Sequence, residues 1–362
     1  MPGNECTALA SGIPQEAAVS TPAASRAVDG SAHAQPLGDP RRERIAALRR
    51  LIAERFGRHV LLEWTRPSPP PDADRGVPLC ASDPRALPTE LLGLDLVLGG
   101  GLPRGRLTEL AGPPYSGKRT LAGWFVRAAQ RTAGWAAYLD AAHGADFDRL
   151  FRWGVDVREL LVALPRSLAE ALELARLLVL ARALDLLVLD VPPQSATRPE
   201  LERGLRQLRP LARGTPTALV VVRDRTREPG LAVAQLRLRL DPLAQLVLPD
   251  PVCSAPRPTG LRVRIRVERS HCWPRCEPPV PVELSERDGV RTALERIDLA
   301  LAWGLVVRHP LGLVFADNVL GRSREAAAVR LAGDPALWSR LEEELRAHWL
   351  SLARSTTGGL VD

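Results

Sequence analysis

Lysine is almost absent from this chain. Of its 49 lysine and arginine residues, only Lys118 is a lysine. A composition so biased toward arginine would have filled position 118 as well, unless a slim and flexible ammonium were needed there. A planar guanidinium cannot follow a phosphate chain through a tight glycine loop, whereas an ammonium can. The scarcity of lysine therefore directs attention to Lys118 and its neighbours as a candidate site.

Long apolar runs are also absent. No stretch approaches the roughly 18 apolar residues that a membrane-spanning helix requires. No basic segment followed by an apolar segment opens the chain either. The sequence therefore predicts a cytoplasmic protein without membrane contact.

Cysteine is scarce, and its number is odd. Five cysteines in 362 residues do not suggest a disulfide framework. One cluster brings an imidazole close to two thiols, and it consists of His271, Cys272 and Cys276, with Cys253 as a fourth candidate ligand. A zinc site usually combines two closely spaced pairs, and no second pair is present. We therefore predict no metal at this cluster.

The charge balance favours an acidic partner. The net charge of +7 is typical of a protein that binds DNA or an acidic protein surface. The excess consists of arginine, which a GC-rich coding bias also supplies, so both explanations stay open. The 45% of hydrophobic residues is enough for one large core and a small additional domain.

The segment around Lys118 has the spacing of a phosphate-binding loop. Gly112 and Gly117 permit the backbone angles by which successive N–H groups surround a phosphate. A helix that starts near Gly117 adds the positive end of its dipole. The predicted nucleotide-binding residues of the loop are Gly112, Tyr115, Ser116, Gly117, Lys118, Arg119 and Thr120. The alternative is a glycine-rich turn that binds no ligand.

The loop lacks its usual magnesium ligand. The pattern has Ser or Thr directly after the lysine, and this chain has Arg119 there. Thr120 comes one residue later, which is a rotation of about 100° on a helix, so its hydroxyl is expected to point away from a metal. Phosphate binding with ATP as the candidate cofactor is therefore favoured, and Mg²⁺ binding is not.

The flanking segments predict a parallel α/β core. Apolar runs typical of buried strands lie at 107–111, 136–140, 185–190 and 217–222. Helical patterns lie at 117–132, 145–153, 167–183 and 199–213. The run at 185–190 closes with Asp190, like a strand that delivers a carboxylate to a magnesium shell. Buried strands also end in Asp as a turn residue, but behind a phosphate loop at this distance the magnesium-shell interpretation is favoured.

Several segments together resemble the bacterial RecA recombinase family. They are 52–57, 92–100, 101–106, the phosphate loop, 138–143, 154–156 and 295–306. The resemblance spans about residues 41–350 and is most specific around the loop and at 295–306. It implies an α/β fold with a RecA-type P-loop core, a mainly parallel sheet flanked by helices, an N-terminal docking helix and a small α+β C-terminal domain.

The departures from the family pattern gather at the phosphate end of the site. The resemblance places Ala142 where RecA has the glutamate that polarises water, and losing such a base commonly lowers the rate about 10²- to 10⁴-fold. Arg149 stands at the adenine-stacking position, and Asp224 stands where a glutamine senses the terminal phosphate. Asp146 and Asp190 complete the predicted nucleotide site. The catalytic residue is therefore unknown, and weak or no hydrolysis is expected.

The case for DNA strand exchange is also weakened. RecA grips single-stranded DNA with two flexible loops, and the matching segments here are short and lack stacking aromatics. Basic side chains still suffice for sequence-independent phosphate contacts, although a solvated turn explains them equally well. The candidate contacts with DNA or with a neighbouring subunit are Arg223, Arg225, Arg227, Arg269 and His271.

Composition divides the chain into five predicted parts. They are a disordered tail (1–40), a basic amphipathic helix (41–65), a proline-rich linker (66–88), the nucleotide-binding core (89–268) and a small C-terminal domain (284–355). In the last part, helical patterns lie at 287–304, 323–332 and 335–353. The apolar stripe of 41–65 packs on its own core or, as the resemblance suggests, docks on another subunit or on RecA.

Three functions are compatible with these residues. The favoured one is an ImuA-like accessory protein of the DNA-damage response and of error-prone translesion synthesis. By the resemblance, its partners would be RecA, an ImuB-like polymerase homologue and an error-prone polymerase. The first alternative is an active DNA-dependent ATPase and recombinase, with Asp140, Asp146 or Asp190 replacing the glutamate. The second is a nucleotide-responsive assembly protein unrelated to DNA.

Overall fold

The computed structural model describes residues 40–62, 84–192, 198–248, 257–271 and 279–357. In this part of the chain, nine strands form one large sheet in the order β11-β10-β9-β8-β3-β7-β6-β4-β5. The parallel strands are β3 (Leu107–Gly112), β4 (Ala136–Asp140), β5 (Leu161–Ala163), β6 (Leu186–Asp190), β7 (Ala218–Asp224) and β8 (Leu236–Leu248). The predicted α/β class with a mainly parallel sheet is confirmed.

The sheet continues through an antiparallel extension. Its strands are β9 (Arg257–Ser270), β10 (Val280–Ser285) and β11 (Gly289–Val290). Residues 284–290 therefore belong to the large sheet and not to the C-terminal domain. The helix expected to begin at 287 begins only at Thr292, because the two preceding strands form a hairpin.

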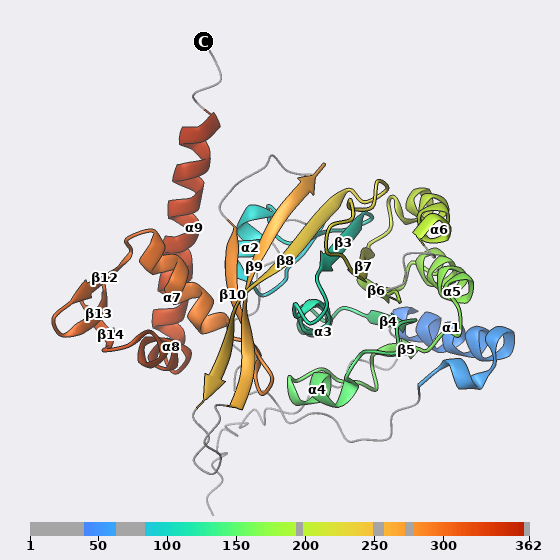
Figure 1. Ribbon diagram of the computed structural model, residues 1–362, viewed down its shortest axis with the longest axis horizontal. Helices are drawn as coiled ribbons and strands as arrows, with labels where there is room; N and C mark the ends of the chain where they lie inside the picture. Colours follow the sequence, from blue (N-terminus) through green and yellow to red (C-terminus); the bar gives the residue numbers. More distant parts are fainter. Residues whose placement is uncertain (1–39, 63–83, 193–197, 249–256, 272–278, 358–362) are drawn as a thin grey trace, which may run out of the picture. The chain divides into compact units, whose positions relative to one another are not determined.

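Both faces of the sheet are covered by helices (Figure 1). On one face pack α3 (Lys118–Arg131) and α4 (Phe147–Arg152), and on the other pack α5 (Leu168–Leu180) and α6 (Arg198–Ala212). Strand β6 shows the alternation, because Leu186 and Val188 enter the first cluster and Leu187 and Leu189 the second. A continuous apolar run is what a strand buried on both faces requires. Each helix matches its predicted range to within a few residues.

The N-terminal helix packs on its own chain. Helix α1 (Pro40–Phe56) buries Ile45, Leu48 and Ile52 in the cluster that contains β4, β5 and α5. After it, Gly57 turns the chain with φ 87°, η1 (Arg58–Val60) follows, and Leu61 bridges to Ala163. The sequence left two options for the apolar stripe, and within this chain the structure shows the intramolecular one. Residues 63–65 of the predicted helix lie outside the described residues.

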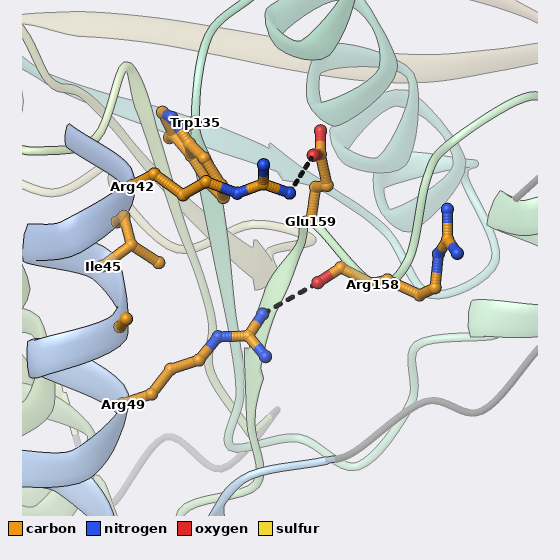
Figure 2. Close-up of a pocket in the computed structure, with 7 residues that line it drawn as sticks. Arg42, Ile45, Arg49, Trp135, Arg158 and Glu159 are labelled. Carbon is orange, nitrogen blue, oxygen red and sulfur yellow. Dashed lines mark hydrogen bonds and ion pairs between the residues drawn. The ribbon is translucent and has the colours of Figure 1, made fainter. Parts of the chain in front are cut away.

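Arginines fasten α1 to the core. A groove of about 400 Å³ lies beside the helix. Figure 2 shows Arg49 there, reaching the main chain of the segment before β5. Its guanidinium donates to the carbonyl oxygens of Arg158 (3.0 Å) and Leu160 (3.2 Å). At the start of the helix, Arg41 pairs with Asp185 at 2.6 Å. The helix is therefore held by apolar burial and by bonds to main-chain carbonyls.

Short elements join the N-terminal segment to the core. Strand β1 (Ala86–Leu87) pairs with β2 (Leu102–Pro103), so the last residues of the predicted linker belong to the folded core. Between them, α2 (Leu92–Val97) carries Asp95, which accepts bonds from the Thr89 amide (2.9 Å) and hydroxyl (2.7 Å). Burial raises the pKa of Asp95 to about 8.

The C-terminal domain combines helices with a small sheet. It consists of α7 (Thr292–Ala302), β12 (Val306–His309), β13 (Gly312–Phe315), β14 (Asn318–Gly321), α8 (Arg324–Ala332) and α9 (Pro335–Thr357). The buried side chains of Leu341 and Leu345 on α9 face its core. The Gly93 amide of α2 donates to Glu295 of α7 at 2.6 Å, which ties this domain to the large core. None of the described helices has the length and apolarity needed to cross a membrane.

We expect Ile52→Ala to lower the free energy of unfolding by about 2–4 kcal/mol, because it removes a fully buried side chain from the contact of α1 with its own core. The neighbouring Leu51 is 44% exposed, so Leu51→Ala is the control and should change stability by no more than about 0.5 kcal/mol. Urea unfolding measures both. The interpretation fails if the Ile52→Ala effect vanishes on dilution, which would mean that the helix is buried only between subunits.

Asp95 should make stability depend on pH. The folded chain holds the Asp95 proton more tightly than the unfolded chain does, because its pKa is raised to about 8. Its contribution is therefore full at low pH and declines as the pH rises from about 4 to about 8. Asp95→Asn should remove this decline, gaining on the order of 2 kcal/mol over wild type between pH 5 and pH 8. Urea unfolding at several pH values measures this, and the exposed Asp317→Asn should leave the wild-type slope unchanged.

Candidate phosphate-binding site

The carboxyl edge of the parallel sheet collects the candidate residues. The register places Asp224 of β7 beside Gly112 of β3, and Asp190 of β6 beside Asp140 of β4. Ligands of open parallel sheets bind at this edge, where the strands end and the next helices begin. The phosphate loop, 113–117, follows β3 directly and leads into α3. The strand order therefore brings one loop and three carboxylates together.

The loop has the backbone geometry of an anion-binding turn. Tyr115 and Gly117 adopt positive φ values of 60° and 82°, and Gly117 caps the N-terminus of α3. A side chain at Gly117 would meet the Leu284 methyl at 2.2 Å, so only glycine fits there. Ser116 is buried, and the Tyr115 ring is exposed. The segment 113–117 is therefore a tight turn between β3 and α3, with Tyr115 at its tip.

Lys118 is fully engaged by the protein. Its ammonium donates to the Pro113 carbonyl (2.6 Å) and to the Ser116 hydroxyl (3.2 Å), and it pairs with the Asp224 carboxylate at 2.8 Å. An ammonium has three N–H donors, so all three have acceptors. The side chain is only 5% exposed, and burial lowers the pKa of Lys118 while Asp224 opposes that shift.

Arg119 lies on the carboxylate of Asp190, the candidate residue for a magnesium shell. Its Nε donates to Asp190 Oδ2 at 2.6 Å, and the Tyr138 hydroxyl donates to the same oxygen at 3.3 Å. A side chain at Gly144 would meet the guanidinium carbon at 2.6 Å, so the group lies against the main chain there. Burial raises the pKa of Asp190 to about 6, and the pairing with Arg119 opposes that shift. A guanidinium thus neutralises Asp190 where a magnesium shell would need a free carboxylate.

The position expected for the nucleotide base is narrow. A cavity of about 90 Å³ lies between the start of α3 and the start of α4, and Thr120, Asp146 and Arg149 line it. Small-molecule sites usually occupy roughly 300–1,000 Å³. Asp146 accepts from the Arg149 amide at 2.9 Å as the N-cap of α4, and their side chains pair at 3.2 Å. A nucleoside would therefore need this pair to move apart.

The acids near Ala142 are all engaged. Asp140 accepts from the amides of Gly144 (3.1 Å) and Ala145 (3.0 Å), which fixes the turn after β4. Asp146 caps α4, and Asp190 is paired with Arg119. A general base must reach the water that it activates with a free lone pair. Each of these three carboxylates therefore already has a structural role in this conformation.

Two of the three basic residues after β7 face the protein. Arg223 pairs with the fully buried Glu109 at 2.7 Å, and it also donates to the Pro229 carbonyl at 3.1 Å. Arg225 is 4% exposed and pairs with Glu268. Of the three, only Arg227 is exposed. The expectation of three guanidiniums at a loop tip therefore does not fit this conformation, because two of them bind carboxylates of the sheet.

The interface candidates on β9 lie together. Arg269 donates to His271 Nε2 at 2.5 Å and to the Ala232 carbonyl at 3.2 Å. His271 is exposed, so this pair can be reached from solvent. Cys253, Cys272 and Cys276 lie outside the described residues.

Both cations at the carboxyl edge are paired with carboxylates of the same chain. Lys118 is matched by Asp224 and Arg119 by Asp190, and Asp140 adds one further carboxylate. With every group ionised, these five side chains sum to a charge of −1. The arrangement offers a phosphate loop without surplus positive charge and a metal-ligand position filled by an arginine.

The sequence predicted the loop, Arg119 and Asp190 as site residues, but it did not predict two contacts that the structure shows among them. It did not anticipate that Asp224 would contact Lys118, or that Tyr138 would donate to Asp190. The one available signal was an acid at the end of the strand 217–222, next to the strand that opens the loop. The contact of this acid with Lys118 can be inferred only when the order of the strands in the sheet is known.

Known proteins similar to this chain carry RecA names. Residues 81–210 match the RecA N-terminal domain. Protein RecA of Thermus aquaticus is 29% identical over 299 residues, which cover 74% of this chain and 85% of that protein. Protein RecA of Chlorobium chlorochromatii is 29% identical over 299 residues, covering 72% of this chain and 81% of that protein. The crystal structure of the RadB recombinase covers 56% of this chain and 98% of its own, with 23% identity and a TM-score of 0.43.

Removing Arg119 should destabilise the fold. Arg119→Ala leaves the carboxylate of Asp190, which is 1% exposed, without its cation. Breaking a buried ion pair costs about 3–5 kcal/mol. Since Arg119 itself is 38% exposed, we expect a loss of about 1–3 kcal/mol. The loss should be larger at pH 8 than at pH 5, because a more strongly raised Asp190 pKa lets the folded chain take up a proton at low pH.

Adding Asp190→Asn to Arg119→Ala should recover most of the lost stability, because the double variant no longer has an unpaired buried charge. Chemical unfolding measures the stability of both variants. Arg287→Ala serves as the control, because its guanidinium is 93% exposed and its removal should be nearly neutral. Equal effects of Arg119→Ala with and without Asp190→Asn would contradict the pairing.

Proposed function

We propose that this chain, a member of the RecA superfamily, is an ImuA-like accessory protein of the DNA-damage response. It acts in error-prone translesion synthesis, beside RecA or an ImuB-like polymerase homologue and an error-prone polymerase. Nucleotide binds weakly and is hydrolysed slowly or not at all. The protein supports other enzymes on damaged DNA and does not itself drive strand exchange.

The bond between Arg119 and Asp190 carries this proposal. Phosphoryl transfer from ATP depends on a cation that bridges the phosphates and neutralises developing charge. Arg119 occupies the sequence position of the metal ligand, and its guanidinium satisfies the carboxylate that would support the metal. A phosphate loop that has its lysine but no free metal ligands is better suited to a structural role than to ATP turnover.

Two further features support the loss of turnover. The three acids near Ala142 are engaged in a turn, a helix cap and an ion pair. The segment after β7 is fastened to the sheet, because Arg223 binds Glu109 and the Leu231 amide donates to Glu109 at 2.8 Å. A segment held in this way is poorly suited to moving with each nucleotide cycle.

A second candidate is a DNA-dependent ATPase that acts in recombination. It is favoured by the similar proteins, which are named RecA and which this chain matches over most of their length. This candidate requires Mg²⁺ to displace Arg119 from Asp190, and it requires a water-activating group. Both requirements can be tested by the same assay.

The deciding experiment measures ATP hydrolysis by the purified full chain with and without single-stranded DNA and Mg²⁺. We expect no DNA-stimulated turnover, and we expect Lys118→Ala to behave like wild type, because the metal shell and the base are missing. Restoring both groups in Arg119→Thr/Ala142→Glu should raise Mg²⁺-dependent turnover above wild type. Wild-type turnover that DNA stimulates and Lys118→Ala abolishes would establish the recombinase candidate.

The proposed role in the DNA-damage response can be tested in cells by the frequency of induced mutations. Deleting the gene should lower the frequency of mutations induced by DNA damage while leaving homologous recombination intact. A recombination defect would favour the second candidate, and a strain with neither phenotype would separate the protein from DNA metabolism.

A further inference from the structure

A phosphate entering the loop finds Lys118 already bound to an anion. The Asp224 carboxylate is the charged one among the three acceptors of the ammonium, and it lies at 2.8 Å. The other two acceptors, the Pro113 carbonyl and the Ser116 hydroxyl, belong to the loop itself. A phosphate oxygen can therefore reach the ammonium only if one of these three acceptors gives way, and Asp224 is the one that competes with it as an anion.

Asp224 is held in this position by its neighbours in the chain. Parallel pairing sets it beside Gly112, and the Arg225 amide donates to the Gly112 carbonyl at 2.8 Å. Arg223 on one side is buried against Glu109, and Arg225 on the other is paired with Glu268. The carboxylate thus reaches Lys118 without the loss of freedom that a diffusing ligand undergoes on binding.

The local charge also disfavours a competing anion. The five ionised groups at the edge sum to −1, and Arg119 is committed to Asp190. A nucleotide triphosphate brings several negative charges, and both cations of this group are already paired with carboxylates. Removing the charge of Asp224 alone would make the sum neutral and free one ammonium donor.

We propose that Asp224 is an internal occupant of the phosphate-binding lysine, so that its carboxylate takes the place of a nucleotide phosphate and keeps the loop closed to anions in the free protein. This inference rests on the nucleotide site of the proposed function and names the residue that limits its affinity. Nucleotide binds only by displacing Asp224 from Lys118. The acid is a specificity-determining residue and not a catalytic one.

The test measures ATP binding by isothermal titration calorimetry on the full chain, in EDTA and in Mg²⁺. Asp224→Asn keeps the shape of the side chain, and Asp224→Ala removes the acceptor altogether. Both should tighten ATP and inorganic pyrophosphate binding by about 10- to 100-fold, the change that corresponds to losing one competing charge-assisted hydrogen bond. Adding Lys118→Ala to either variant should abolish the gain.

Asp156→Asn is the matched control, because it removes the same charge near the far end of α3, where Gln130 donates to the Asp156 carbonyl. It should bind ATP like wild type, which separates the local contact from net charge. Thermal unfolding checks that each variant is folded, and the 20% exposure of Asp224 favours this. Unchanged affinity in the folded Asp224→Ala protein would overturn the inference.

Hydrolysis, measured in parallel, separates this inference from the proposed function. A variant that binds ATP more tightly and turns it over on DNA would contradict the proposed loss of catalysis while supporting the role of Asp224. A wild-type protein that binds ATP as tightly as Asp224→Ala and does not hydrolyse it would overturn the role of Asp224 alone.

Discussion

The need to neutralise buried charge governs the carboxyl edge of the sheet. Parallel pairing brings Asp224, Asp190 and Asp140 to the strand ends around the phosphate loop. Charges out of water persist only when they are paired or hydrogen-bonded. Lys118 and Arg119 supply two of the partners, and main-chain amides serve Asp140. This edge therefore folds without phosphate or metal, and the same pairs restrict what can bind there.

Arginine extends this principle beyond the site. Its planar group makes several bonds in fixed directions, so one side chain can tie a loop to a sheet. Arg223 joins β7 to the buried Glu109 and to a main-chain carbonyl. Arg324 joins α8 to Glu283 of the large sheet and to Asp298 of α7. Such contacts keep separate segments of the chain in place.

Local sequence patterns predicted much of the fold. Apolar runs and periodicity, which depend only on neighbouring residues, predict four central strands and the helices between them. The strands lie at 107–112, 136–140, 186–190 and 218–224. Residues 284–290 were predicted to lie in the C-terminal domain but belong to the large sheet, because β10 pairs with β9 and β11 pairs with β10. The three strands at 306–321 were not located, since each is only four residues long and paired only within its own sheet. Pairing between distant segments leaves little trace in a single sequence.

The sequence by itself determined the glycine and lysine spacing of the candidate phosphate loop and the arginine that follows Lys118, because both depend on residue type at a fixed spacing. The tertiary structure alone decided that Asp224 meets Lys118, that Asp190 meets Arg119, and that α1 buries Ile52 against its own core. These contacts join residues 71 or more positions apart. Strand order and helix packing set them, and both arise from the burial of the whole apolar core and not from any local stretch of chain.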